Sequence, residues 1–300
     1  MGQNITLIFN PIAGAKKRKG KIIDYLERTF VKHGHRTALC ETSKRGEATE
    51  FAKQALCNHA DVVVAIGGDG TINEIGSALV HTGVPLGIVP AGSGNGLARS
   101  LNIPQNVEQA SEVILRGLTC RIDVGKANNN YFFLLAGLGF DAVVGKKFDE
   151  HSKRGPIPYF YLGAKEYFGY KPEWMEVSFN QVSRKIQPFV MAVANGGQYG
   201  NGAIIAPEAK LNDGLLDVCI VTRLSFLQLF SAIPKLFQGK LKSYRDVEFH
   251  TTRKIRIVRE APGLVNIDGE PIFEEATVEI SLLPKSLNVI VPRNSPGLNR

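Results

Sequence analysis

Short apolar runs alternate with segments of helical periodicity through roughly the first 120 residues. The runs are rich in Val, Ile and Leu, which is typical of strands buried on both faces. The expected strands are 4–9, 36–41, 61–66 and 85–89, and the expected helices are 16–30, 46–57, 72–79, 97–101 and 107–115. Hydroxyls at Thr42 and Ser43 are expected to cap the second helix. This order predicts a parallel sheet with helices on both faces.

The pattern changes near residues 121–125, and most later segments read as strands separated by turns rich in Asn, Gly and Pro. The expected strands are 131–135, 175–179, 188–194, 215–221, 247–250, 254–257, 264–267 and 277–281, with helices at 159–168 and 225–237. This pattern predicts an antiparallel β domain. The domains are therefore expected at 1–122 and 123–283. A last strand, 287–291, fits either domain, so 284–300 is a candidate for returning to the first.

The apolar run 62–66 leads directly into the sequence Gly-Gly-Asp-Gly-Thr-Ile-Asn-Glu at 67–74, which opens a helical pattern. Glycines allow backbone N–H groups to approach a bound group closely, and the helix directs its positive end to the same place. A tight structural turn is the simpler alternative. Asp69 and Thr71 add a carboxylate and a hydroxyl that such a turn does not need, so the sequence favours a nucleotide phosphate site.

Two further loops fall at the carboxyl ends of neighbouring strands, at 10–14 and 92–95. In open α/β sheets this edge is where ligands bind. Three such loops are more specific than one. Lys16 and Lys17 would add positive charge there, although a solvated helix face also explains them.

Length and composition limit the remaining classes of protein. The 300 residues suggest about two domains, and the net charge of +8 suits an anionic partner such as a nucleotide or an anionic membrane surface. Nucleic acid is not an expected partner, because no reading motif accompanies the charge. Four cysteines without CxxC spacing indicate neither a disulfide framework nor a zinc site. No signal segment or long apolar run is seen, which predicts a cytoplasmic protein.

The sequence bears on two other nucleotide-binding motifs. The chain has no GxxxxGK[ST] sequence, which excludes a P-loop protein. The stretch 137–142 matches G-x-G-x-x-A, but no βαβ unit is expected around it. A tight turn in the β domain is the preferred interpretation.

Together these motifs resemble the catalytic domain of the diacylglycerol kinase, sphingosine kinase and ceramide kinase superfamily. In the first half the resemblance is carried by Asn10-Pro11 with Gly14, by 67–74 and by 90–95. In the second half it is carried by 199–202, 206–207, 211–218 and 266–270. The resemblance implies an NAD-kinase-like α/β nucleotide-binding domain followed by an antiparallel β-sandwich that takes the lipid substrate. The cleft between them would be the active site.

The resemblance also implies which residues bind the cofactors ATP and Mg²⁺. Asp69 would help to hold Mg²⁺ at the phosphates. The residues that would contact ATP are Asn10, Pro11, Gly14, Thr42, Gly67, Gly68, Asp69, Gly70, Thr71, Asn73 and Ser93.

A second magnesium site and a catalytic base are implied in the β domain. The metal would be bound by the Asp213 carboxylate and the carbonyl groups of Lys210 and Leu215, although an ordinary turn also explains the Asn-Asp-Gly sequence there. Glu270 would be the catalytic base. A carboxylate that merely follows an Asp-Gly hairpin turn is the alternative, and Asp268 is the competing base.

These roles predict an ATP-dependent lipid kinase of lipid metabolism and phospholipid biosynthesis, in peripheral contact with anionic membrane. The apolar residues of 225–237 are a candidate for that contact, and a core helix is the alternative reading. An NAD kinase and a nucleotide-binding protein without catalysis are the other functional hypotheses. Gly96 stands where bacterial diacylglycerol kinases commonly carry an acidic residue, so the acceptor, of diacylglycerol or sphingoid type, stays open. The oligomeric state also stays open, with a homodimer as one candidate.

Overall fold

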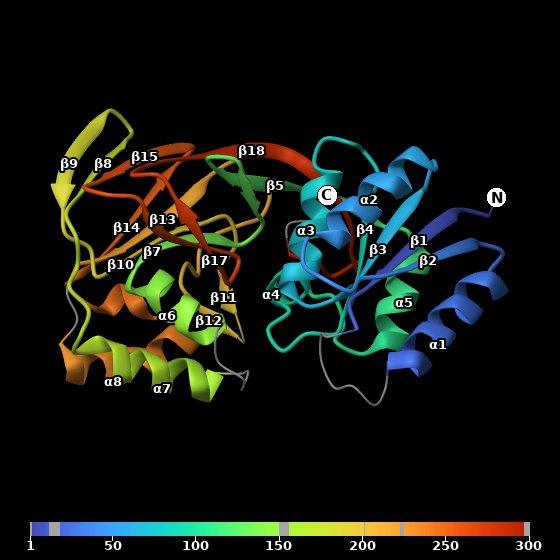
Figure 1. Ribbon diagram of the computed structural model, residues 1–300, viewed down its shortest axis with the longest axis horizontal. Coiled ribbons are helices and arrows are strands. Elements are labelled where there is room, and N and C mark those ends of the chain that lie inside the picture. Colours follow the sequence, from blue (N-terminus) through green and yellow to red (C-terminus); the bar gives the residue numbers. More distant parts are fainter. Residues whose placement is uncertain (1, 12–18, 150–155, 201, 223–224, 297–300) are drawn as a thin grey trace. The chain divides into compact units, whose positions relative to one another are not determined.

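The computed structural model describes the chain except residues 1, 12–18, 150–155, 201, 223–224 and 297–300 (Figure 1). The chain divides into two compact units. The first comprises Met1–Ile122 and Lys285–Arg300, and the second comprises Asp123–Pro284.

The first unit is built on a parallel sheet in the order β2-β1-β3-β4. Its strands are β1 (Asn4–Phe9), β2 (Arg36–Glu41), β3 (Val62–Gly67) and β4 (Leu86–Pro90). Its helices are α1 (Lys19–Lys32), α2 (Glu47–Cys57), α3 (Asp69–Leu79), α4 (Gly96–Ser100) and α5 (Val107–Arg116). Helices α1 and α5 cover one face of the sheet, and α2 and α3 cover the other (Figure 1). The prediction of a doubly covered parallel sheet is confirmed.

The start of α2 differs from the prediction. Its N-cap is Gly46, which has a φ of 88° and no side-chain cap. Thr42 Oγ1 donates to Phe9 O, and Ser43 Oγ donates to the carboxylate of Glu47 in the first turn of α2, not to the helix backbone. The carboxylate of Glu74, on α3, accepts hydrogen bonds from the N–H groups of Gly46 (3.0 Å) and Ala48 (3.2 Å). A carboxylate from the neighbouring helix therefore performs the capping that the hydroxyls were expected to provide.

The second unit contains an antiparallel six-stranded sheet in the order β14-β13-β10-β7-β16-β17. These strands are β7 (Leu135–Gly139), β10 (Val190–Ala194), β13 (Leu216–Val221), β14 (Val247–Thr252), β16 (Gly263–Ile267) and β17 (Glu270–Glu274). The facing strands are β5 (Thr119–Ala127), β6 (Asn130–Phe132), β8 (Met175–Phe179), β9 (Val182–Ile186), β15 (Lys254–Arg259) and β18 (Thr277–Ile290). A short pair, β11 (Gln198–Gly200) and β12 (Ala203–Ile204), and the helices α6 (Phe140–Asp149), α7 (Pro156–Tyr167) and α8 (Phe226–Phe237) complete the unit. The predicted antiparallel β domain is confirmed.

Both faces of the six-stranded sheet are buried, and β10 shows how. Met191 and Val193 pack into the core shared with the facing strands. Ala192 and Ala194 point the other way, into a core that α8 closes with Ala232. This double burial explains why an antiparallel strand carries an uninterrupted apolar run instead of alternating with polar residues.

Helix α6 was not predicted, because the tight turn expected at 137–142 is the junction between β7 and this helix. Phe140 and Val144 are four residues apart and pack with Phe189 and Leu162 in a separate apolar cluster. The helical spacing was present in the sequence, but the glycines at its start favoured a turn.

Strand β18 joins two segments that were expected to be separate strands. Thr277–Val278 and the following residues pair antiparallel with β15, whereas Val289 pairs with Leu86 of β4 in the parallel sheet. Lys285, next to Pro284, has a φ of 50°. The second half of β18 therefore adds a strand to the first unit.

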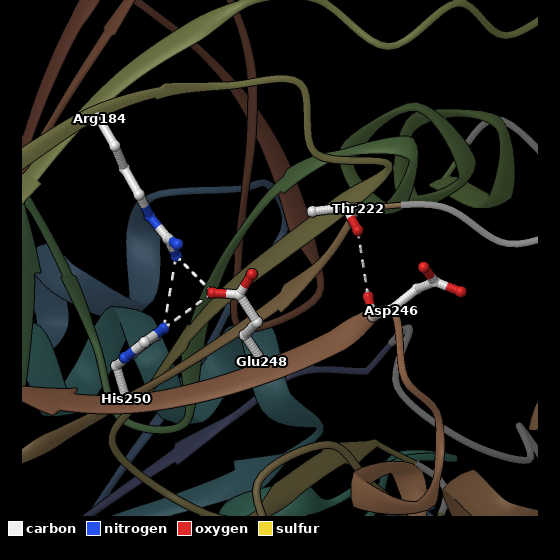
Figure 2. Close-up of polar contacts among 5 residues, drawn as sticks. All are labelled: Arg184, Thr222, Asp246, Glu248 and His250. Atoms are coloured by element: carbon white, nitrogen blue, oxygen red, sulfur yellow. Dashed lines mark hydrogen bonds and ion pairs between the residues drawn. The ribbon is translucent and has the colours of Figure 1, made fainter.

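A polar cluster links two edge strands of the second unit, as Figure 2 shows. Arg184 on β9 donates a hydrogen bond to Glu248 Oε2 on β14 at 2.7 Å, and His250 Nε2 lies 3.1 Å from the same oxygen. The hydrogen bond from Arg184, followed by that from His250, lowers the pKa of Glu248. The cluster therefore joins the edge of one sheet to the edge of the other.

We expect Glu248→Gln to lower the free energy of unfolding at pH 7 by up to about 1 kcal/mol, because the pair is partly exposed and screened by solvent. A lowered carboxyl pKa contributes stability above the pKa of the unfolded state, and this contribution is lost as the pH falls through the folded-state value. The difference between variant and wild type should therefore shrink at pH 3. Urea unfolding at both pH values measures it, with the exposed Glu260→Gln as control. A difference independent of pH would contradict the argument.

Candidate active site

The glycine turn lies at the carboxyl end of β3, where three chain segments meet. Gly68 is the N-cap of α3 and provides no side-chain cap, and the first N–H groups of a helix have no acceptor within it. Asn10, at the end of β1, donates from Nδ2 to Thr71 Oγ1 at 3.2 Å and from its backbone N to Ile66 O at 3.1 Å. The turn thus offers backbone donors at a positive helix end, beside an amide and a hydroxyl.

The loop after β4 contacts this turn directly through glycine backbone. A Cβ placed on Gly92 would lie 2.5 Å from Gly68 Cα and 2.9 Å from Asn95 Oδ1. The backbone N of Ala91 also donates to Gly67 O at 2.8 Å. A side chain does not fit at Gly92, and one at Gly68 would lie only 3.2 Å from Gly92 Cα, so this contact gives both glycines a structural reason in addition to their expected role at a phosphate.

Asp69 fixes the second loop in place. Its carboxylate accepts hydrogen bonds from the backbone N–H groups of Asn95 (2.8 Å) and Gly96 (2.6 Å). Burial raises the pKa of Asp69, and the hydrogen bonds from Gly96 and Asn95 oppose that shift. The carboxylate that the sequence singled out as a magnesium ligand is thus also an anchor for the loop, and its role at the metal stays a prediction.

The other expected ATP contacts are distributed around these loops. The backbone N of Thr42 donates to Phe9 O at 2.9 Å, so this buried residue lies at the end of β1, next to Asn10. Asn73 is half-buried on α3, and Ser93 is exposed on the second loop. Pro11, half-buried, follows Asn10, whereas Gly14 lies outside the described residues.

Glu270 opens β17 after a two-residue hairpin turn. Asp268 and Gly269 have φ values of 49° and 91°, as a type I′ turn requires. The Asp268 carboxylate accepts three backbone hydrogen bonds, from Phe133 (2.7 Å), Leu134 (2.9 Å) and Leu135 (3.0 Å). Asp268 therefore holds the turn to the neighbouring chain segment, which leaves Glu270 as the better candidate for a base.

A buried polar pair close to this hairpin was not singled out by sequence reasoning. Asn266 on β16 lies opposite Pro271, the residue after Glu270, and donates from Nδ2 to Asp141 Oδ2 at 2.9 Å. A Cβ on Gly137 would overlap the Asp141 carboxylate. The first glycine of the G-x-G-x-x-A match therefore makes room for an aspartate, which is the signal in the sequence that pointed to this pair.

The expected second magnesium site lies on a turn. Leu215 N donates to Asp213 Oδ1 at 3.1 Å, and Gly214 N donates to Asp123 Oδ2 at 2.7 Å. Burial, with the charges of Asp213 and Glu208, raises the pKa of Asp217 to about 6. Within the described part of the chain, no three His, Cys, Asp or Glu side chains are grouped to hold a metal ion. A site with one carboxylate and two carbonyl groups falls outside that criterion and remains a prediction.

The chain combines an α/β unit that carries glycine-rich loops with a unit of antiparallel β-sheet. Residues 4–127 match the family model described as the diacylglycerol kinase catalytic domain. Residues 135–291 match the model described as the YegS C-terminal NAD kinase beta sandwich-like domain.

Similar proteins and structures agree with these matches. The chain is 32% identical to the "Probable lipid kinase YegS-like" of Chromohalobacter salexigens over 89% of this chain and 87% of that protein. It is 27% identical to the "Diacylglycerol kinase" of Bacillus subtilis over 88% of each chain. A crystal structure of a diacylglycerol kinase from Bacillus anthracis has the same fold, with a TM-score of 0.73, 22% identity and 97% coverage of both chains. The chain belongs to the diacylglycerol kinase and YegS-like lipid kinase family.

We expect Asp69→Asn to lower the free energy of unfolding by about 1–3 kcal/mol, even without nucleotide or metal. An amide provides only one acceptor oxygen, so its NH₂ group would face one of the N–H groups of Asn95 and Gly96. Urea unfolding of the protein free of nucleotide and metal measures the effect, with the exposed Asp24→Asn as control. Unchanged stability would show that Asp69 does not anchor the loop.

Gly92→Ala should weaken ATP binding at least about tenfold, which corresponds to 1.4 kcal/mol. Its Cβ would push the second loop away from Gly68 and the start of α3, where the phosphates are expected to bind. Calorimetric titration with ATP gives the affinity. Gly20→Ala is the matched control, because no atom lies within 4 Å of a Cβ at that position. Wild-type affinity in Gly92→Ala would argue against a phosphate site at this contact.

Proposed function

We propose that this family member is an ATP-dependent lipid kinase that transfers the γ-phosphoryl group to the hydroxyl of a lipid of diacylglycerol or sphingoid type. The observation that carries the proposal is the pair of loops that Asp69 joins, in a chain whose relatives include named lipid and diacylglycerol kinases. Phosphoryl transfer needs positioning and neutralisation of charge more than covalent chemistry from the protein.

The first unit is proposed to hold the nucleotide. The N–H groups of the first turn of α3 and the Asn10 amide are the groups suited to phosphate oxygens. Asn10, Thr42 and Ser93 stay among the proposed ATP contacts. Asp69 would in addition hold Mg²⁺, which supplies charge neutralisation at the phosphates.

Glu270 is the proposed catalytic base. It would accept the proton of the acceptor hydroxyl as the hydroxyl oxygen forms its bond to the γ-phosphorus. The bond between the γ-phosphorus and the β–γ bridging oxygen would break, and ADP would leave. Asp268 fixes the turn before Glu270, which gives the base a defined backbone position. The second magnesium ion would bind Asp213 and the carbonyl groups of Lys210 and Leu215, where it would order the turn instead of taking part in transfer.

The acceptor is proposed to be reached at a membrane surface. Within the described residues, the helices are all too short or too polar to cross a bilayer. Peripheral contact with anionic lipid, favoured by the net charge of +8, would bring the enzyme to its acceptor from the cytoplasm.

Glu270→Gln should reduce phosphorylation of a lipid extract with labelled ATP by roughly 10²–10⁴-fold, because it removes the base. ATP binding and thermal stability should stay at wild-type values. The exposed Glu275→Gln, at the other end of the same hairpin, is the matched control.

NAD is offered as acceptor in parallel. Preference for NAD would favour the NAD kinase hypothesis, and slow turnover with every acceptor would favour a protein without catalysis. Undiminished lipid phosphorylation by Glu270→Gln would reject Glu270 as the base.

A further inference from the structure

Helix α7 has one face in a core and one in solvent. Leu162 is buried beside Phe140, and the Tyr167 ring lies 6.5 Å from the Phe140 ring. Tyr161 on α7 is 66% exposed, and Phe168, the first residue after the helix, is 74% exposed. The exposed side of α7 and the residue after it thus present large aromatic rings where a surface helix ordinarily presents polar residues.

Helix α8 continues this exposed aromatic surface. Its sequence FLQLFSAIPKLF carries a single charged residue, Lys235. Ala232 and Leu236, four positions apart on one side of α8, pack on the core of the six-stranded sheet. Phe230 is 50% exposed, so the apolar arc of α8 extends beyond what the core covers.

Ring contacts join the two helices into one surface. The Phe168 and Phe226 rings are 4.7 Å apart, and the Phe226 and Phe230 rings are 4.9 Å apart. We call Tyr161, Phe168, Phe226 and Phe230 the aromatic ledge; α7 and α8 lie side by side in Figure 1. Large aromatic rings gathered at the surface in this way mark an interaction surface.

The charged residues near the ledge indicate what kind of surface it binds. Lys165 is exposed on α7, four positions after Tyr161 and three before Phe168, and the single charged residue of α8 is Lys235. Aromatic rings beside a lysine suit the boundary between lipid headgroups and acyl chains, where the rings are buried and the ammonium meets phosphate.

We propose that the aromatic ledge of α7 and α8 is the surface by which this protein docks on an anionic lipid bilayer. The inference rests on the proposed function, since a lipid acceptor lies in a bilayer. The proposal names the surface that contacts the bilayer. The exposed part of α8 belongs to that surface, whereas Ala232 and Leu236 pack on the core.

The test is cosedimentation with vesicles of equal parts phosphatidylcholine and phosphatidylglycerol, without ATP. The double variant Phe168→Ser, Phe230→Ser should lose more than about tenfold in partitioning, because burying each Phe ring contributes about 1.5–3 kcal/mol. The matched control is Phe273→Ser, whose ring is 73% exposed on β17. Equal losses in both, or none in the double variant, would overturn the proposal. Thermal unfolding must show both variants folded.

A second measurement does not depend on removing apolar surface. Trp174 is the only tryptophan, so Trp174→Phe with Phe230→Trp leaves one reporter on the ledge. Its emission should shift to the blue with the anionic vesicles and less with phosphatidylcholine alone. An unshifted emission would overturn the proposal. Light scattering that shows a dimer broken by the double serine variant would do the same, because a second copy would then cover the ledge.

The two proposals fail separately. Vesicle binding is measured without turnover, so ledge-dependent binding by a protein that phosphorylates no lipid would overturn the proposed function and leave the docking surface standing. Lipid phosphorylation with partitioning unaffected by the serine variant would overturn the docking surface alone.

Discussion

One carboxylate organises the candidate nucleotide site. Asp69 accepts the N–H groups of Asn95 and Gly96, and so it ties the loop after β4 to the turn after β3. Because both loops follow parallel strands, they already lie at the same end of the sheet. The hydrogen bonds to Asp69 only have to fix the distance between the two loops. Burial makes that carboxylate costly to ionise, and the two N–H donors offset the cost. Loss of the carboxylate or of the N–H groups leaves the other partner buried without a hydrogen bond.

The same logic holds the candidate base in the second unit. Three backbone N–H groups bind Asp268, which lets a two-residue turn keep a positive φ at a residue other than glycine. Glu270 then starts a strand whose pairing with β16 sets its direction. In both units an aspartate next to a glycine, Asp69 or Asp268, binds backbone N–H groups of another chain segment. These hydrogen bonds fix the backbone that carries the residues proposed for catalysis and binding.

The sequence predicted the alternation of strands and helices in the first unit because buried parallel strands are continuous apolar runs, as in Val62–Ile66. It did not reveal the cap of α2, since Glu74 is far from Gly46 along the chain and only packing of α3 on α2 brings them together. Helix α6 was missed because glycines at 137 and 139 look like a turn, although the first accommodates Asp141 and the second a φ of 83°. The anchoring contacts of Asp69 were equally invisible, because a motif shows that a carboxylate is present but not which groups it contacts.

The contacts of Gly96 change what this residue indicates about the acceptor lipid. Its contribution to the loop is a backbone N–H to Asp69 Oδ1, which any residue but proline would supply. An acidic residue at this position would therefore keep the backbone N–H that Asp69 binds and would add a charge beside the two loops. Gly96 consequently carries little information about the hydroxyl that receives the phosphoryl group. The groups that discriminate between acceptors are better sought in the second unit, where Asp141 and Asn266 form a buried polar pair one strand position from Glu270.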